Sequence, residues 1–520
     1  MLMKPFKILL FMASLFIIIS ALYFIFPASG INVTEQFSLK FITPDDFVKK
    51  ERNAYADISH VLKIHSLLTD TALSVPAKED IQHTLFSSIT DTIKKKAFQP
   101  VSGSDKLILP SSKTNFNIDS LKLSLQKIEY PDGSVNPLST FFSELISRNK
   151  ENEPIRIMHY GDSQIEGDRI SSVLRNRMHA YFGGSGPGLV PATVDNLISL
   201  TVLHNSSNNW KIFKKCGFNQ RYAEHKKYGA LLNFSRLIPV STNDTNTVQG
   251  WLSLKKSPYC LESVKKFKQC RLFCANNKKA ASVELYSKGV LLDKKYIPAE
   301  NHFSILKFTF EETPEETVFK FKGTACPDVY GIALDDETGI AVDNVAMRGS
   351  AGLEFTKTDM EFLKEMYQRL NVKLVILQFG VNIVPNISSN YSFYEDGLYS
   401  QLASLKKICP DLSILVVGVS DMSRRINGNY ASYPNVELIR DAQKRATFKA
   451  GCAFWDLYEA MGGRNSMPSW VFTKPQLART DFTHFTNKGA GIVADLLYNA
   501  MIFDYLDYVK KGLPIEEARK

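Results

Sequence analysis

The sequence has no second hydrophobic run long enough to cross a membrane, no internal repeat, no low-complexity tract and no long basic block. Together with 44% hydrophobic and 22% charged residues, these absences exclude a polytopic membrane protein, collagen and wholesale disorder. The 520 residues suffice for two or three globular domains. The net charge of +10 is spread over short lysine clusters, which is typical of a solvated surface, and no motif supports nucleic-acid binding.

Cysteine is also scarce, with seven residues, and no metal site is recognisable. Cys270 and Cys274 lack the second CxxC or the histidine pair that a zinc site needs. If the protein is exported to an oxidising compartment, pairing among the five cysteines between 216 and 326 stays open. The total is odd, so at least one thiol is unpaired.

The single long apolar run lies at the N-terminus. It extends from Ile8 to Phe26, follows Lys4 and Lys7, and ends at Pro27. A helix needs roughly 20 residues to cross about 30 Å of hydrocarbon, so residues 8–27 are predicted to be a transmembrane signal anchor. The preceding lysines place residues 1–7 in the cytoplasm and export the rest. Cleavage after this run, giving a secreted protein, is the alternative.

The first stretch of the chain after the anchor contains no catalytic or ligand-binding motif. Residues 28–145 contain helix-like segments and a part rich in Pro, Ser and Gly, and we predict a stem or spacer. From residue 146, apolar runs at 155–158, 374–379 and 414–419 are typical of strands buried on both faces of a parallel sheet.

Helix-like segments lie between these strands, which predicts a doubly wound α/β domain made of residues 146–200 and 340–510. Those segments are 169–180, 356–370, 394–407 and 436–450. Residues 201–339 alternate apolar with polar side chains and include a hairpin pattern around Lys288-Gly289, so an all-β insert is predicted there. Residues 511–520 form a tail.

Polar motifs stand where a doubly wound sheet binds ligands, beyond the carboxyl ends of its strands. Gly161-Asp162-Ser163 follows the first strand and would project a hydroxyl into the crevice. Asp481 precedes His484 by three residues, so its carboxylate can bond Nδ1 and leave Nε2 free as a base for a serine. The backbone N–H of Gly349 and the amide of Asn382, with the Ser163 N–H, would form an oxyanion hole. Alone, each motif also fits an ordinary turn or surface residue.

Taken in this order, the motifs resemble those of the SGNH (GDSL-type) hydrolase superfamily. The chain is similar to one branch in particular, the periplasmic peptidoglycan O-acetylesterases. The resemblance covers roughly residues 150–510 and includes His159 to Gln164, Gly183 to Gly188, Ile376 to Asn382 and Phe454 to Met467. That branch also carries an insert like a carbohydrate-binding module. The chain departs from many superfamily members at Ile383, where they have Asp.

The resemblance implies a three-layer, flavodoxin-like α/β fold interrupted by a jelly-roll-like insert, and it implies no cofactor. It assigns Ser163 as nucleophile, His484 as general base and Asp481 as the residue that orients His484. The oxyanion donors would be Ser163, Gly349 and Asn382. Substrate contacts would come from Gln164, Arg348 and Gly463.

The activity implied is that of an exported serine O-acetylesterase acting on an O-acetylated polysaccharide, with peptidoglycan favoured. The protein would be a single-pass protein of the cell inner membrane with its catalytic domain in the periplasm. One alternative is a glycan O-acetyltransferase, in which a sugar instead of water takes the acetyl group. The other is a non-catalytic glycan-binding protein of the cell envelope, and the presence of Ser163, Asp481 and His484 argues against it.

Overall fold

The computed structural model describes residues 10–18, 21, 31–34, 37–39, 55–63, 125–133, 136–147, 153–195, 199–217, 220–239, 247–299, 303–426 and 428–512. The chain separates into two compact units, residues 1–55 with 425–431, and residues 56–424 with 432–520. In the first unit, strand β1 (Ile31–Thr34) pairs antiparallel with β2 (Phe37–Leu39). A further two-stranded sheet consists of β19 (Ser423–Ile426) and β20 (Asn429–Ser432).

Half of the predicted membrane anchor, residues 8–27, lies outside the described residues. Residues 10–18 are helical, and their large apolar side chains are exposed. In the part of the chain that the structure describes, no helix combines the length and apolar character needed to cross a bilayer. The anchor at 8–27 therefore stays a prediction.

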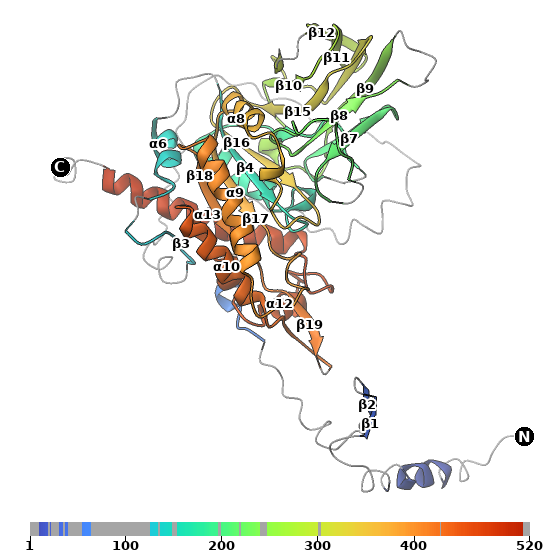
Figure 1. Ribbon diagram of the computed structural model, residues 1–520, viewed down its shortest axis with the longest axis vertical. Helices are drawn as coiled ribbons and strands as arrows, with labels where there is room; N and C mark the ends of the chain where they lie inside the picture. The colour runs from blue at the N-terminus through green and yellow to red at the C-terminus, as the bar shows by residue number, and fades with distance from the viewer. Residues whose placement is uncertain are drawn as a thin grey trace, which may run out of the picture. The chain divides into compact units, whose positions relative to one another are not determined.

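The larger unit contains a six-stranded sheet in the order β16-β4-β17-β18-β21-β3 (Figure 1). Its strands are β3 (Ile128–Glu129), β4 (Ile155–Gly161), β16 (Ile340–Ala346), β17 (Val372–Gln378), β18 (Ser413–Val417) and β21 (Ala453–Trp455). All neighbours are parallel except β3, which pairs antiparallel with β21 at the edge. The five parallel strands have the order 2-1-3-4-5, so the doubly wound, flavodoxin-like arrangement is confirmed.

Helices cover both faces of this sheet and complete three layers. Helices α6, α7 and α13 pack on one face, and α8, α9 and α10 pack on the other. They are α6 (Ser139–Ser147), α7 (Ser171–Phe182), α8 (Met360–Arg369), α9 (Ser392–Ile408), α10 (Val436–Lys449) and α13 (Asn487–Gly512). Short turns of helix are η1 (Glu166–Asp168), η2 (Glu262–Val264), η3 (Phe355–Lys357), α11 (Leu457–Ala460) and α12 (Ser466–Phe472).

The region between α7 and β16 is a two-sheet β-sandwich, as the sequence predicted. One sheet runs β13-β10-β15-β8-β7 with β5 also paired to β15, and the other runs β12-β11-β14-β9-β6. The predicted hairpin is present, because β11 and β12 pair antiparallel and both Lys288 and Gly289 have positive φ, as a tight primed turn requires.

The sandwich strands are β5 (Gly188–Val190), β6 (Val202–Ser206), β7 (Trp210–Lys214), β8 (Asn233–Leu237), β9 (Val248–Lys256), β10 (Gln269–Ala275), β11 (Ala281–Ser287), β12 (Val290–Ile297), β13 (Ser304–Thr309), β14 (Glu316–Gly323) and β15 (Asp328–Asp335). One hydrophobic core fills the space between the two sheets. It includes Cys270 and Cys274. All seven cysteines are free thiols in the structure.

The sandwich and the α/β sheet share a second core and a buried ionic network. Tyr228, Phe234 and Tyr330 of the sandwich pack in one cluster with Tyr160 of β4 and Phe362 of α8. Beside this cluster, Arg156 of β4 is fully buried and pairs with Asp335 of β15 and with Asp343 of β16 at 2.6 Å. The two substructures are thus joined by packed side chains and by buried ion pairs between Arg156 and the two aspartates.

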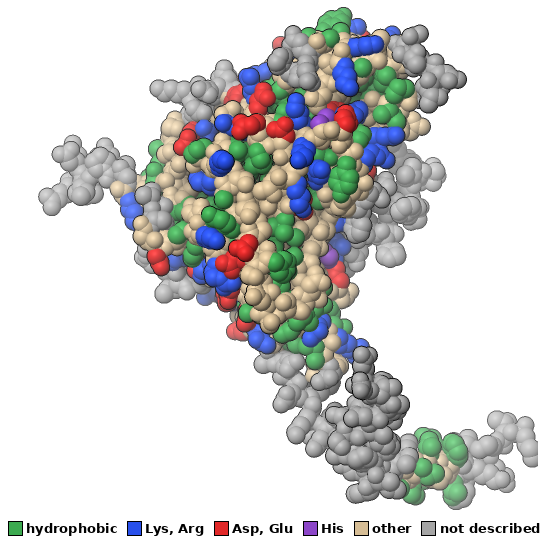
Figure 2. All heavy atoms as spheres, viewed as in Figure 1, with side chains coloured by type: hydrophobic (Ala, Val, Ile, Leu, Met, Phe, Trp, Pro, Cys, Tyr) green, Lys and Arg blue, Asp and Glu red, His purple; other side chains and the backbone are tan. Residues whose placement is uncertain are grey.

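The α/β layer begins earlier than the boundary at 146 that the sequence suggested. Strand β3 and helix α6, both from the predicted stem, join the edge and one face of the sheet. Residues 55–63 also pack here, with Ile58 and Val61 buried. Most of the remaining predicted stem, including residues 40–54 and 64–124, lies outside the described residues. Figure 2 shows basic and acidic side chains interspersed on the visible face of the described part.

Candidate active site

The predicted triad forms a continuous hydrogen-bonded chain at the carboxyl edge of the sheet. Ser163 Oγ lies 2.8 Å from His484 Nε2, and His484 Nδ1 lies 2.8 Å from Asp481 Oδ2. Ser163 follows β4, and His484 lies in the loop that leads into α13, so 321 residues separate the two partners along the chain. Ser163 is partly exposed, which leaves its hydroxyl accessible to a substrate.

Asp481 is held in its charged form. Its partial burial would favour the neutral acid, but the His484 side chain and the N–H groups of His484 and Thr483 all bond the carboxylate, and together they lower its pKa to about 2. A carboxylate that stays ionised keeps a proton on His484 Nδ1 and leaves Nε2 to accept the serine proton.

Asp162 is fully buried beside Ser163, and its contacts stabilise the turn that follows β4. Burial raises its pKa to about 7, although the Gln164 N–H, which donates to Asp162 Oδ1 at 3.0 Å, favours the charged form. The Asp162 N–H donates to the Gln378 carbonyl at 3.2 Å. Asp162 therefore connects the nucleophile turn to the end of β17, the strand that precedes the Asn382 loop.

Two further side chains, Arg169 and Gln164, connect the nucleophile turn to the loop that carries His484. The sequence did not predict this role for either residue. Arg169 is buried and donates to the carbonyl oxygens of Ser163 at 2.8 Å, Glu166 at 2.8 Å and Phe485 at 2.7 Å. Gln164 is 2% exposed and donates to the Thr483 carbonyl at 2.7 Å and to Ser420 Oγ at 3.2 Å.

These contacts change the interpretation of Gln164. The resemblance implied a substrate contact, but both observed donations from its amide go to the protein and the side chain is buried, so we assign it as a positioning residue. No sequence pattern reveals this role, because Phe485 and Thr483, whose carbonyl groups Arg169 and Gln164 bond, lie more than 300 residues away in the chain.

Beneath the turn lies a polar network. His159 is fully buried between Gln378 Oε1 and Ser171 Oγ, each at 3.0 Å, and burial lowers its pKa to about 4. Asn344 bonds Ser171 Oγ and the Ile165 carbonyl. A neutral imidazole here connects strands β4 and β17 to α7 and supports the turn from below.

The predicted oxyanion donors lie on loops that flank the nucleophile. Gly349 follows β16 and Asn382 follows β17, and these two strands are the neighbours of β4 in the sheet. Asn382 Nδ2 donates to the Ser350 carbonyl at 2.8 Å, which ties the two loops together. A primary amide has a second hydrogen for a ligand. Gly349 has φ of +80° and is exposed, and its backbone conformation favours glycine.

The remaining two predicted substrate residues occupy different surroundings. Arg348 is half-exposed at the mouth of the site and donates to Glu166 Oε2 at 2.6 Å. The Gly463 N–H bonds the Tyr458 carbonyl just after α11, which closes that helical turn. Gly463 therefore has a structural role, since its N–H closes the turn after α11. Of the two residues, Arg348 is better placed to contact a ligand.

The sandwich borders this site on the side of the Gly349 loop. A Cβ on Gly217, in the segment after β7, would lie 3.1 Å from the Arg348 carbonyl, so the two backbones are in close contact. The Asp359 N–H, before α8, donates to the Lys226 carbonyl at 2.8 Å. The insert thus forms one wall of the crevice.

Comparison with solved structures identifies a protein of similar fold. A peptidoglycan O-acetylesterase shares 19% identity with a TM-score of 0.56, over 73% of this chain and 99% of the other. An acetyl xylan esterase (13% identity, TM-score 0.25, 31% of this chain and 81% of the other) and a family two carbohydrate esterase from Cellvibrio japonicus (8%, 0.22, 59% and 99%) are more distant.

No protein-family model and no curated protein matches the sequence. The likeness to the solved peptidoglycan O-acetylesterase shows the fold alone.

Proposed function

We propose that the protein is a serine carbohydrate O-acetylesterase that removes acetyl groups from an O-acetylated glycan. The observation that carries this proposal is the Ser163–His484–Asp481 chain of hydrogen bonds, with 2.8 Å at both links, beyond the carboxyl ends of a doubly wound sheet. A partly exposed serine with this support is an activated nucleophile. The SGNH-hydrolase-like fold is consistent with the same chemistry.

The reaction proceeds in two balanced steps. Ser163 Oγ attacks the acetyl carbonyl while His484 Nε2 takes the serine proton, and the N–H groups of Ser163 and Gly349 with the Asn382 amide stabilise the oxyanion. The bond between the acetyl carbon and the sugar oxygen breaks, and His484 returns its proton to that oxygen. Water, deprotonated by His484, then attacks the acetyl-serine, releasing acetate and restoring Ser163.

Peptidoglycan is the glycan that we favour. The motifs after the sheet strands resemble the peptidoglycan O-acetylesterase branch, and the solved structure of similar fold is described as such an enzyme. A membrane-anchored, periplasmic placement, with residues 8–27 as the anchor, agrees with this substrate and is part of the proposal. Transfer of the acetyl group to a sugar hydroxyl instead of water uses the same intermediate and is decided by the test below.

The test compares the wild-type protein, residues 28–520, with Ser163→Ala. We expect acetate release from O-acetylated peptidoglycan and from an aryl acetate, with a loss of about 10⁴-fold or more in kcat for the variant, because the covalent step is removed. Equal rates for the two proteins would overturn the proposal. Acetyl transfer to an added sugar acceptor, without acetate release, would replace the esterase with the transferase.

A further inference from the structure

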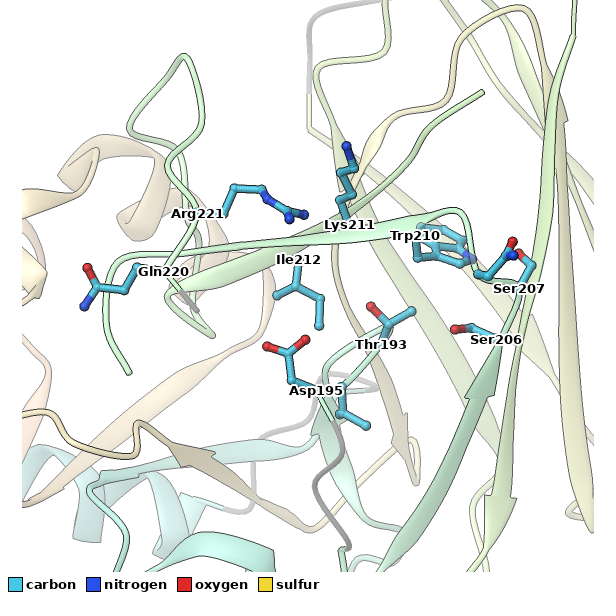
Figure 3. Close-up of a pocket in the computed structure, with 11 residues that line it drawn as sticks. Thr193, Asp195, Ser206, Ser207, Trp210, Lys211, Ile212, Gln220 and Arg221 are labelled. Carbon is cyan, nitrogen blue, oxygen red and sulfur yellow. The ribbon is translucent and has the colours of Figure 1, made fainter. Parts of the chain in front are cut away.

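A second concave site lies in the sandwich, apart from the triad. It is a cavity of about 640 Å³ at the open edge where β6 turns into β7 (Figure 3). Strands β6 and β7 each lie at the end of a sheet, next to β9 and β8 respectively, and Lys214 at the end of β7 also forms an antiparallel bridge with Arg221, so the cavity lies at the edges of both sheets. The volume is within the range of sites that hold small molecules or sugar units.

The chemistry of the lining suits a carbohydrate. Ser206, Ser207, Asn208 and Gln220 contribute hydroxyl and amide groups. Trp210 is half-buried, and its orientation is fixed because its indole N–H donates to the Trp251 carbonyl at 3.0 Å. A held indole beside hydroxyl and amide groups offers an apolar face to a sugar ring and hydrogen-bond partners to its hydroxyls.

The charges of the lining favour an anionic sugar. Asp195 is already neutralised by Lys214, whose Nζ lies 2.6 Å from its carboxylate. Figure 3 shows Asp195 and Arg221 directed toward the space beside Ile212, whereas Lys211 points away from it. Arg221 is exposed and therefore provides the charge that the Lys214–Asp195 pair does not cancel. A guanidinium binds a carboxylate through two parallel hydrogen bonds.

The cavity is connected to the candidate active site through short segments. The Leu200 N–H donates to the Gly167 carbonyl at 3.0 Å, in the nucleophile turn, and only six residues separate Leu200 from Ser206 at the cavity. On the other side, Gly217 contacts the Arg348 backbone. Six residues extend at most about 20 Å, so a short oligosaccharide could occupy both sites together.

We propose that this cavity is a distal subsite for the same glycan chain, in which Arg221 binds a carboxylate carried by the chain while an acetyl ester lies at Ser163. This inference rests on the proposed function and deepens it, because it makes the substrate an acidic glycan. Peptidoglycan, through its peptide and lactyl carboxylates, and a polyuronate both have that chemistry.

The experiment uses Arg221→Gln and Asp195→Asn, with Arg369→Gln as the matched control. Arg369 is an exposed arginine at the end of α8, just before β17 begins, so it lies at the amino ends of the parallel strands, away from the triad. For each protein, kcat/KM is measured on O-acetylated peptidoglycan, an O-acetylated polyuronate and an O-acetylated neutral xylan, and each is divided by kcat/KM for an aryl acetate.

We expect Arg221→Gln to lower the ratio about 10-fold for acidic glycans through a higher KM, and to leave the ratio for neutral xylan unchanged. Asp195→Asn should raise it, because Lys214 then loses the carboxylate that cancels its charge, and Arg369→Gln should not alter it. Whichever acidic polymer shows the loss is identified as the source of the carboxylate. An unchanged ratio, or an equal fall on neutral xylan, would overturn the proposal.

Binding separates this proposal from the proposed function. In a Ser163→Ala background, calorimetric titration with fragments of each polymer should show weaker binding of acidic fragments after Arg221→Gln. If the wild-type protein hydrolyses no ester but this loss of binding is seen, the esterase proposal fails and the subsite stands. If ester hydrolysis is seen and binding is insensitive to Arg221, the reverse holds.

Discussion

At the scale of single residues, Asp162 should make stability fall as pH rises. Its pKa is about 7 in the folded protein, above the ordinary value of 3.8, so between these pH values the unfolded chain releases a proton that the folded protein retains. Its contribution to stability is therefore fully present below pH 4 and lost as pH rises through 7. The free energy of unfolding of the wild type should fall between pH 5 and pH 8. In Asp162→Asn we expect this fall to be smaller by roughly 3 kcal/mol.

Urea unfolding at the two pH values measures this difference. An exposed carboxylate of the same type, Asp411, supplies the control Asp411→Asn, for which the pH dependence should match that of the wild type. Parallel curves for wild type and Asp162→Asn would contradict the prediction.

Arg169 should affect catalysis only by positioning Ser163 relative to His484. Its three donations connect the carbonyl groups of Ser163, Glu166 and Phe485, and so keep the nucleophile in register with the histidine loop. We expect Arg169→Met to lower kcat on an aryl acetate by about 10²-fold with little change in KM, because a shift of about 1 Å at the reacting atoms costs that much. Arg169→Lys, which restores one donor, should recover part of the loss.

Titration of active sites with a serine-reactive phosphonate distinguishes this role from simple loss of folded protein. The prediction requires a lower kcat per titrated site. If the loss of activity merely follows the number of titrated sites, Arg169 is a folding residue and not a positioning one.

Whether a residue of the candidate site could be predicted from the sequence depends on how far along the chain its partners lie. Asp481 and His484 are three positions apart, so the carboxylate–imidazole pair could be predicted from spacing alone. Ser163, Gly349 and Asn382 could be placed because each follows a strand, and parallel strands end at one edge. Arg169 and Gln164 could not, because a hydrogen bond to a loop carbonyl over 300 residues away leaves no trace in local sequence.

At the scale of elements, the turn after β17 depends on a glycine. Gly380 has φ of +132°, and an added Cβ would lie 2.8 Å from Val419 Cβ and 3.0 Å from Gln443 Nε2. Gln443 itself connects the ends of β17 and β18, through the Phe379 carbonyl at 2.7 Å and the Val419 N–H at 2.8 Å. We expect Gly380→Ala to destabilise the protein by about 2 kcal/mol or more.

The same substitution should also lower kcat, because the turn carries Asn382. The matched control is Gly491→Ala in α13, where a Cβ meets only Val173 Cγ2 at 4.0 Å. That change should stabilise the helix by up to about 1 kcal/mol. Chemical unfolding and aryl acetate kinetics measure both effects, and a neutral Gly380→Ala would show that the turn tolerates a side chain.

Elements were predictable where their residues form a long pattern. The β11–β12 hairpin has apolar residues on both sides of Lys288-Gly289, and β17 and β18 contain continuous apolar runs. Strand β3 was not predictable, because it has only two residues and its place at the sheet edge is set by β21, over 300 residues later. Helix α6 was assigned to the stem for the same reason: its partners β17 and β18 are distant in sequence.

At the scale of the whole molecule, the insert and the α/β sheet should behave as one folding unit. Asp335, at the end of β15, is fully buried and pairs with Arg156 of β4 and, at 3.1 Å, with Arg271 of β10. Asp343 of β16 bonds the same Arg156 and also accepts the Leu189 N–H at 2.7 Å. A guanidinium buried at this junction is stable only while its carboxylates from both sides are present.

Asp335→Asn should therefore destabilise both substructures together, by about 3–5 kcal/mol, because it removes one of the two carboxylates that neutralise the buried Arg156. Hydrogen exchange in mild denaturant should show amides of β14 and of β17 losing protection at the same, lowered denaturant concentration. The control Asp293→Asn removes a surface pair with Lys295 and should cost less than about 1 kcal/mol. If Asp335→Asn opened the sandwich while β17 stayed protected, the insert would be an independent domain, and the shared core would not couple glycan binding at the insert to the geometry of the triad.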